Sequence, residues 1–116
     1  GLKDHQDHEL FCRIGRPDYG FGGLLTIDAG NRERAESLMD DLQNTEGFGF
    51  MAVSLGYFDT LMSCSASSTS SELSDEAMRS AGISPGLLRM SIGFTGSLEQ
   101  RWQQLERALN RVGLIQ

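Results

Sequence analysis

One arginine in the last third of the chain is the residue best suited to chemistry. Arg89 lies in the segment 87–93, where apolar and other residues alternate with the two-residue period of a β-strand. Leu88, Met90 and Ile92 are expected on one side of this strand, and Arg89 on the less apolar side. A guanidinium on a rigid strand can bind a carboxylate through two parallel hydrogen bonds. A surface or interdomain salt bridge is the alternative, and the pattern alone leaves both open.

A second candidate is Ser54, which ends the apolar run 50–54, a run suited to a buried strand, just before a Leu-Gly pair. Its hydroxyl and amide are predicted at the lip of a sheet, where a ligand could reach them. It lacks the context of a nucleophile, because no GxSxG motif surrounds it and neither histidine shows any sign of acting as its base. A serine that simply ends a strand is the alternative.

Other polar or glycine-rich segments lack the spacing that a metal or phosphate site needs. His5, His8 and Glu9 could share one helical turn, but they lack the HExxH order and a third ligand at a sequence spacing typical of a metal site. The run from Gly20 to Gly23 precedes a predicted strand, and no Lys-Ser or Lys-Thr pair follows it. We therefore expect neither a metal site nor a phosphate loop.

The lysine and cysteine content gives no catalytic centre either. The single lysine, Lys3, lies in a loosely held N-terminal segment, which argues against Schiff-base catalysis within this chain alone. Cys12 and Cys64 are far apart and belong to no CxxC pair, so reduced thiols are expected. The sequence thus predicts no catalytic residue and no cofactor-binding residue in the chain.

The composition fits one small soluble domain. The 116 residues are 39% hydrophobic and 22% charged, which is enough apolar surface for one core. The formal net charge of -6 opposes binding to phosphate backbones, so no nucleic-acid partner is expected. No apolar run approaches the roughly 20 residues that span a bilayer, and the first residues lack the apolar stretch of a signal peptide. A cytoplasmic protein without membrane contact is expected.

Apolar periodicity and turn residues divide the chain into alternating strands and helices. Strands are predicted where short apolar runs lie between glycines, and helices where apolar residues recur at spacings of three and four. Seven serines between positions 63 and 74 leave too little apolar surface for a packed element, which predicts a loop. The predicted order is a strand at 23–28, a helix at 31–45, a strand at 50–54, the loop at 63–74, a short helix at 75–82, a strand at 87–93 and a helix at 97–113.

The two longer helices each carry an apolar stripe. In the helix at 31–45 the stripe comprises Ala35, Leu38, Met39 and Leu42. In the helix at 97–113, which Ser97 and Gln100 begin as a capping box, the stripe expected to be buried comprises Leu98, Trp102, Leu105, Leu109 and Val112. Such helices cover only one sheet face well, so the pattern predicts an α+β fold, a two-layer sandwich whose other face needs a partner.

Several ordered motifs in the chain resemble one known enzyme family. They are Ala52-Val53-Ser54-Leu55-Gly56, Thr60-Leu61, the serine-rich stretch 65–70 and, above all, residues 82–93, which read Gly-Ile-Ser-Pro-Gly-Leu-Leu-Arg-Met-Ser-Ile-Gly. Over nearly its whole length the chain is similar to the C-terminal domain of the Cys/Met-metabolism pyridoxal-phosphate (PLP) enzymes. The resemblance implies a small, mostly antiparallel sheet with helices packed on one face, as in fold-type I PLP enzymes.

The same resemblance implies how the chain relates to a whole enzyme. Residues 1–116 would be a single substrate-side domain, with residues 1–20 as its lead-in helix or linker. The large domain that carries PLP and its lysine is absent, so the chain alone is expected to be inactive. Implied partners are a small sulfur amino acid substrate and the PLP-binding domain of the same enzyme, which as a whole would be a homotetramer.

In the family, the arginine that matches Arg89 binds the substrate α-carboxylate, and the serine that matches Ser54 lies beside that carboxylate. The resemblance therefore implies that both residues bind substrate. Val53 stands where cystathionine-handling members usually carry glutamate, and in this it is similar to methionine γ-lyases. A valine would present an apolar wall suited to a methyl-sulfur side chain. Val53 is thus a third expected substrate-binding residue.

The implied activity is that of a PLP-dependent carbon-sulfur lyase that converts methionine to methanethiol, ammonia and 2-oxobutanoate. The alternatives are an O-acetylhomoserine sulfhydrylase, a cystathionine γ-synthase or lyase, or a non-catalytic interaction module that kept this fold. The chain also departs from the family pattern. Ser65 and Ser70 replace the usual proline and histidine, and Tyr57 replaces the usual Asp or Gly.

Overall fold

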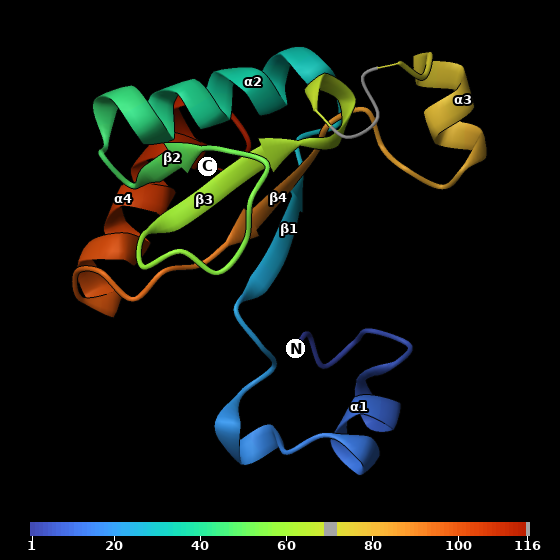
Figure 1. Cartoon of the computed structure of the whole chain (residues 1–116), viewed down its shortest axis with the longest axis vertical. Coiled ribbons are helices and arrows are strands. Elements are labelled where there is room, and N and C mark those ends of the chain that lie inside the picture. The colour runs from blue at the N-terminus through green and yellow to red at the C-terminus, as the bar shows by residue number, and fades with distance from the viewer. Residues whose placement is uncertain (69–71, 116) are drawn as a thin grey trace.

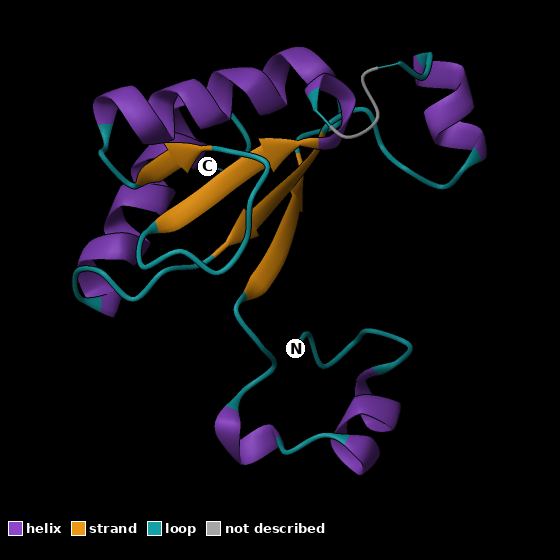
Figure 2. Cartoon of the chain, in the orientation of Figure 1, coloured by secondary structure: helices purple, strands orange, loops and turns teal. Residues whose placement is uncertain are grey.

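A four-stranded sheet with helices packed on one face forms the folded part of the chain (Figure 2). The computed structural model describes residues 1–68 and 72–115. Its helices are α1 (His8–Ile14), α2 (Arg32–Asp40), α3 (Asp75–Ser80) and α4 (Leu98–Arg111), and its strands are β1 (Leu24–Asp28), β2 (Gly49–Met51), β3 (Thr60–Cys64) and β4 (Leu87–Ser91). Short 3-10 turns at Pro17–Tyr19 and Ser65–Ser67 and a π-helical turn at Asp41–Thr45 complete the elements. The predicted α+β class is confirmed.

The strand order is β1-β4-β3-β2, which places β4 and β3 at the centre. β4 runs antiparallel to both β1 and β3, and only β2 pairs with its neighbour β3 in parallel. The expectation of a mostly antiparallel sheet is therefore correct. Within the register, Arg89 on β4 faces Thr26 on β1 and Ser63 on β3.

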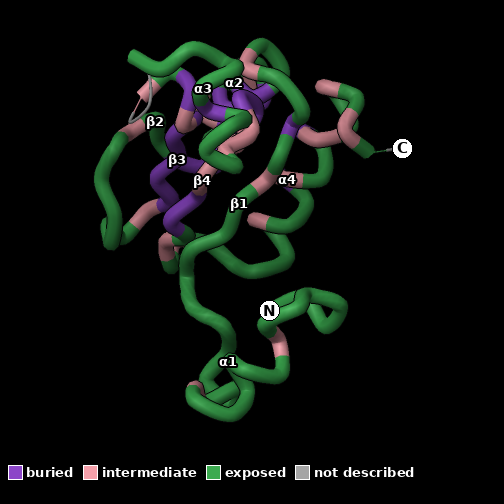
Figure 3. The backbone as a smooth tube through the Cα atoms, turned by 90° about the vertical axis from the view of Figure 1, so that its right-hand side faces the viewer, coloured by how far each residue is buried: buried purple, intermediate pink, exposed green. Residues whose placement is uncertain are grey.

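The hydrophobic core lies between the sheet and the helices α2 and α4 (Figure 3). α2 contributes the stripe that its spacing predicts, and the π-helical turn adds the last member, Leu42. From the sheet, Met62, Leu88 and Met90 are fully buried against that stripe. One residue of α4, Ala108, joins them. By burying this face only, the helices leave the opposite face of β1, β4 and β3 free of helices.

α4 turns a different side to the sheet from the one its apolar spacing predicts. Its buried residues are Gln104 and Ala108, whereas Leu98 is 87% exposed and Trp102 is 54% exposed. The prediction of a buried stripe is therefore wrong for the first two turns of the helix. It holds in part for the later ones, since Leu105, Leu109 and Val112 pack against the core.

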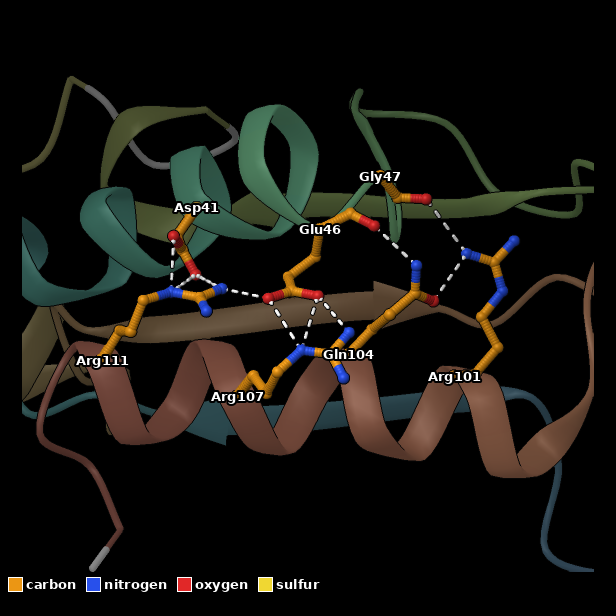
Figure 4. Close-up of polar contacts among 7 residues, drawn as sticks. All are labelled: Asp41, Glu46, Gly47, Arg101, Gln104, Arg107 and Arg111. Carbon is orange, nitrogen blue, oxygen red and sulfur yellow. Dashed lines mark hydrogen bonds and ion pairs between the residues drawn. The ribbon is translucent and has the colours of Figure 1, made fainter.

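A polar network determines how α4 is rotated about its axis (Figure 4). Arg107 and Arg111 both bind the carboxylate of Glu46, whose side chain is only 6% exposed, and Arg111 also pairs with Asp41 at 2.7 Å. These partners lie 61 to 70 residues before the arginines that bind them. The network is completed by hydrogen bonds from Arg101 and Gln104 to backbone carbonyls of Glu46, Gly47 and Phe48. Long-range charges, and not only apolar spacing, thus select the inward side of α4.

Acid is expected to weaken the fold through Glu46. The hydrogen bond from Arg107 lowers the pKa of Glu46 below its ordinary value of 4.5. The lowered pKa stabilises the folded chain above about pH 4.5, and that stabilisation is lost as the pH falls through the lowered value. Glu46→Gln is therefore expected to reduce the free energy of unfolding by about 1 kcal/mol at neutral pH. In this variant the free energy of unfolding should also fall less steeply as the pH is lowered.

Urea unfolding of the 116-residue chain as a function of pH measures this effect. The matched control is Glu36→Gln, which changes an exposed glutamate of α2. If both variants lost the same stability at neutral pH and the same pH dependence, Glu46 would have no special part in holding α4.

β3 is the element that local patterns failed to predict. All five of its residues are buried, including Ser63 and Cys64, which the sequence pattern wrongly placed in the loop at 63–74. A strand that is buried on both faces shows no alternation of apolar and polar residues, so its period gives no signal. Residues 69–71 of that predicted loop lie outside the described residues.

β2 is shorter than predicted, and two of its three residues are exposed. It ends at Met51, and Phe50 and Met51 are 49% and 43% exposed, so the expectation of a buried strand at 50–54 is wrong. β2 is an edge strand, which leaves one side without a sheet neighbour. Residues 52–54 instead begin the connection to β3.

Residues 1–23 form an arm that extends from the sheet (Figure 1). The arm contains α1 and the 3-10 turn Pro17–Tyr19, and none of its residues is buried. Phe11 and Phe21 contact one another within it, with ring centroids 5.1 Å apart. No helix in the described parts of the chain has the length and apolarity needed to cross a bilayer.

Candidate functional site

Arg89 occupies the centre of the sheet face that the helices leave open. Its strand neighbours Leu88 and Met90 are fully buried toward the helices, so Arg89 projects from the opposite face, as the alternation predicts. Its cross-strand partners Thr26 and Ser63 put it in a row of three polar residues. Because strands on both sides hold β4, the base of this side chain is fixed more firmly than a loop would allow.

The guanidinium of Arg89 is only partly satisfied within the described residues. Its Nη2 donates to the carbonyl oxygen of Ser54 at 3.0 Å, whereas its Nε is buried and has no hydrogen-bond partner there. A buried N–H without an acceptor costs about 1–3 kcal/mol. The Nε–H of Arg89 is therefore a donor that the described residues leave unused.

No carboxylate of the described chain neutralises Arg89. Among residues 1–68 and 72–115, Asp and Glu side chains form ion pairs with Arg32, Arg101, Arg107 and Arg111 but none with Arg89. The alternative of a salt bridge within the described chain is therefore wrong, while a salt bridge to another domain stays open. A charged donor on a rigid strand, without an internal anion, is suited to an external carboxylate.

The connection between β2 and β3 lies over this same face, and we call residues 52–59 the crossing loop. Since β2 and β3 are parallel neighbours, the chain must run back along the sheet before β3 can begin (Figure 1). Two side chains of β4 hold it in place. Arg89 donates to the carbonyl of Ser54, and the hydroxyl of Ser91 accepts from the amide of Gly56 at 3.1 Å. The crossing loop thereby brings Ser54 to Arg89.

The fold only partly brings together the three substrate-binding residues that the family resemblance implies, Arg89, Ser54 and Val53. Ser54 contacts Arg89 through its backbone carbonyl, and it lines a hollow of about 370 Å³. Val53 is 59% exposed and lines a different hollow, of about 640 Å³, between α2 and the crossing loop. The chain bends at Val53, and the two neighbouring residues line different hollows.

Arg89 itself lines a third hollow, of about 470 Å³, between β1 and the N-terminal arm. Its walls include Thr26, two leucines of β1 and three residues of the arm. Charge-assisted hydrogen bonds are stronger beside apolar walls than in open water. The hollow therefore has room for a small molecule and one strong anchor for its carboxylate.

Sequence reasoning missed the residues that attach the crossing loop to β4. Ser91 lies two positions after Arg89, so the two-residue period already placed it on the same face. Nothing local indicated that Gly56, with its positive φ of 72°, would present its amide to that serine. The contact spans 35 residues and exists only in the folded chain.

Of the remaining candidates from the sequence, His5 lines the hollow of Arg89, whereas His8, Cys64 and Lys3 do not. His8 lies on α1 with its Nε2 3.6 Å from the Sγ of Cys12, and Cys64 is buried in β3. Within the described residues, no group of three His, Cys, Asp or Glu side chains is arranged to hold a metal ion. Lys3 belongs to the arm and does not line the hollow of Arg89.

Comparison with known proteins places this geometry in a family context. The family model for the Cys/Met metabolism PLP-dependent enzymes matches residues 1–110. The chain is 58% identical over 112 residues to a methionine γ-lyase of Arabidopsis thaliana, a match that covers 97% of this chain and 25% of the relative. It is 33% identical over 109 residues to a cystathionine γ-lyase of Bacillus subtilis, which covers 91% of this chain and 27% of the relative.

Solved structures agree with these matches. A cystathionine γ-synthase of Xanthomonas oryzae pv. oryzae in complex with cystathionine superposes with a TM-score of 0.77 at 33% identity, covering 98% of this chain and 28% of that one. A putative O-acetylhomoserine (thiol)-lyase of Campylobacter jejuni, with N'-pyridoxyl-lysine-5'-monophosphate, gives 0.74 at 32% identity, covering 94% and 24%. The chain spans about a quarter of the length of the curated relatives that it matches.

Both kinds of comparison agree along nearly the whole chain, including the crossing loop and the strand that carries Arg89. They lead to one conclusion, that this chain belongs to the family of Cys/Met metabolism PLP-dependent enzymes.

Proposed function

We propose that this chain forms the substrate-side part of a PLP-dependent carbon-sulfur lyase, and that it binds the α-carboxylate of a sulfur amino acid through Arg89. The observation that carries the proposal is the state of that side chain. It lies on the open face of the sheet, has a buried Nε–H without a partner and has no carboxylate against it in the described residues. Methionine is the substrate proposed, with methanethiol, ammonia and 2-oxobutanoate as products.

The residues of this chain do not fit the role of holding the cofactor. PLP in enzymes is carried on a lysine as a Schiff base. The only lysine here is Lys3, in the arm, where no residue is buried. The proposal therefore assigns PLP, and the electron sink that it supplies, to residues outside these 116. No chemical step is assigned to the present chain.

Arg89 and Ser54 would act by fixing the orientation of the substrate. A guanidinium that binds both oxygens of a carboxylate restrains rotation as well as position. With the α-carboxylate held, the remaining bonds at the α-carbon point in defined directions, which is the main requirement of a site that must break one of them selectively. The carbonyl of Ser54, which accepts from Nη2, would keep the guanidinium plane in place while the carboxylate binds.

A chimeric enzyme tests the proposal. It joins this chain to the remaining residues of the Arabidopsis thaliana methionine γ-lyase, which matches 97% of the chain. Methionine, cystathionine and O-acetylhomoserine with sulfide are each supplied, and products are measured together with the PLP absorbance band. Release of 2-oxobutanoate and methanethiol from methionine is the expected result. Turnover of only one of the other substrates would support the alternative enzymes, and bound PLP without any turnover would support an interaction module.

Val53 is proposed to favour a thioether over a charged side chain. Val53→Glu in the chimeric enzyme is expected to lower kcat/KM for methionine about tenfold and to raise the ratio of cystathionine to methionine turnover, because a carboxylate replaces an apolar wall. Leu55→Glu puts the same charge on the same loop, but beside the hollow that Ser54 lines. If both variants shifted the ratio equally, Val53 would have no specific role in substrate choice.

A further inference from the structure

We propose that Ser91 is a positioning residue, which holds the crossing loop in the place where Ser54 can meet Arg89. The effect of Ser91 on substrate binding rests on the proposed function. The holding of the crossing loop by Ser91 does not depend on that function. Ser91 is 7% exposed, lies two residues after Arg89 on β4 and projects from the same face of the sheet.

The contacts of β4 with the crossing loop have a matched spacing. Arg89 and Ser91 are two residues apart, and the loop residues that they contact, Ser54 and Gly56, are also two residues apart. The bonds have opposite polarity, since Arg89 donates to a carbonyl at 3.0 Å and Ser91 accepts from an amide at 3.1 Å. Two such bonds fix both the position of the loop along β4 and the direction of its backbone.

Little else holds the middle of the crossing loop. Residues 53–58 are all exposed, so apolar packing contributes little there. The ends are attached by backbone hydrogen bonds, from the amide of Ala52 to Met62 and from the amide of Phe94 to the carbonyl of Phe58. Between these ends, the hydrogen bonds from the rest of the described chain to the loop are those made by Arg89 and Ser91.

Substrate binding gives Ser91 its importance. When Arg89 binds a carboxylate, its guanidinium must donate to the ligand as well as to the Ser54 carbonyl. The bond from Gly56 to Ser91 does not involve the ligand, so it keeps the loop in register throughout. Without it, the Gly56 amide would lose a buried acceptor, and the loop would have to be ordered again each time the substrate binds.

The experiment compares three variants of the chimeric enzyme. Ser91→Ala removes the acceptor, Ser91→Thr keeps a hydroxyl in the same strand position, and Ser84→Ala is the matched control. Ser84 also accepts from a glycine amide, that of Gly86 at 3.2 Å, but it precedes β4 and lies away from the loop. Ser91→Ala is expected to raise KM for methionine about tenfold with kcat changed less than about twofold, and Ser91→Thr to recover most of the loss.

Amide hydrogen exchange of the peptide that covers residues 53–58 gives a readout besides activity. Faster exchange is expected in Ser91→Ala, and the unaltered rate in Ser84→Ala. If Ser91→Ala matched Ser84→Ala in both KM and exchange, the proposal would be overturned. A chimeric enzyme inactive toward methionine, but with faster exchange in Ser91→Ala only, would reject the proposed function while leaving the positioning of the loop by Ser91 supported.

Discussion

Replacing Arg89 with alanine is expected to lower kcat/KM of the chimeric enzyme for methionine by about 10²- to 10³-fold, the loss typical of a charge-assisted pair of hydrogen bonds. The expected cause is direct. Arg89 is the cation on the open sheet face, its Nε–H lacks an acceptor, and the alanine variant leaves the substrate carboxylate without either donor. Arg89→Lys keeps the charge but loses the planar fork, so it is expected to recover only a part of the activity.

The controls for this result separate binding from folding. Arg79→Ala removes an exposed arginine of α3 and is expected to leave kcat/KM within about twofold. The PLP absorbance band and the thermal midpoint show whether each variant has assembled. Equal kcat/KM in Arg89→Ala and the unmodified chimeric enzyme, with both assembled, would refute the proposed carboxylate site.

Replacing Gly93 with alanine is expected to cost about 3 kcal/mol of unfolding free energy and to displace the end of the crossing loop. A Cβ at this position would collide with the carbonyl oxygen of Phe58 and the carbonyl carbon of Asp59, closer than real Cβ atoms approach any atom. Both are backbone atoms, which cannot move aside as a flexible side chain would. The amide of the next residue, Phe94, also donates to the same Phe58 carbonyl at 2.9 Å.

Urea unfolding of the chain measures this loss, with Gly23→Ala as the matched control. Gly23 lies beside β1, has no positive φ, and its added Cβ would meet only the carbonyl of Ile92, at an ordinary 3.7 Å. Its substitution is expected to change stability by less than about 1 kcal/mol. A Gly93→Ala chain as stable as the Gly23→Ala chain would mean that the loop and β4 do not approach as closely as the structure has them.

Local patterns were sufficient for the elements whose signals lie within a few residues. The spacing of Ala35, Leu38 and Met39 predicted α2, and the serines at 74 and 97 accept from backbone amides as N-caps, as expected. Alternation along 87–91 placed Arg89 on the side away from the core. These signals work because caps and one-sided burial depend on neighbours along the chain.

Other features of the fold depended on partners far away in sequence. β3 is buried on both faces, which removes the alternation that would reveal it. The rotation of α4 follows from Glu46 and Asp41, at least 61 residues before the arginines that bind them. No local period contains such information, because charges select among rotations of a helix only once the opposing surface exists.

The candidate site shows the same division. The sequence identified Arg89, Ser54 and Val53 as residues of interest, and its strand pattern determined the side on which Arg89 lies. Only the tertiary structure decided that Ser54 meets Arg89 through its carbonyl, that Val53 lines a separate hollow, and that Ser91 holds the loop. The physical reason is that a parallel strand pair forces its connection back across the sheet, and that path brings together residues 35 apart in the chain.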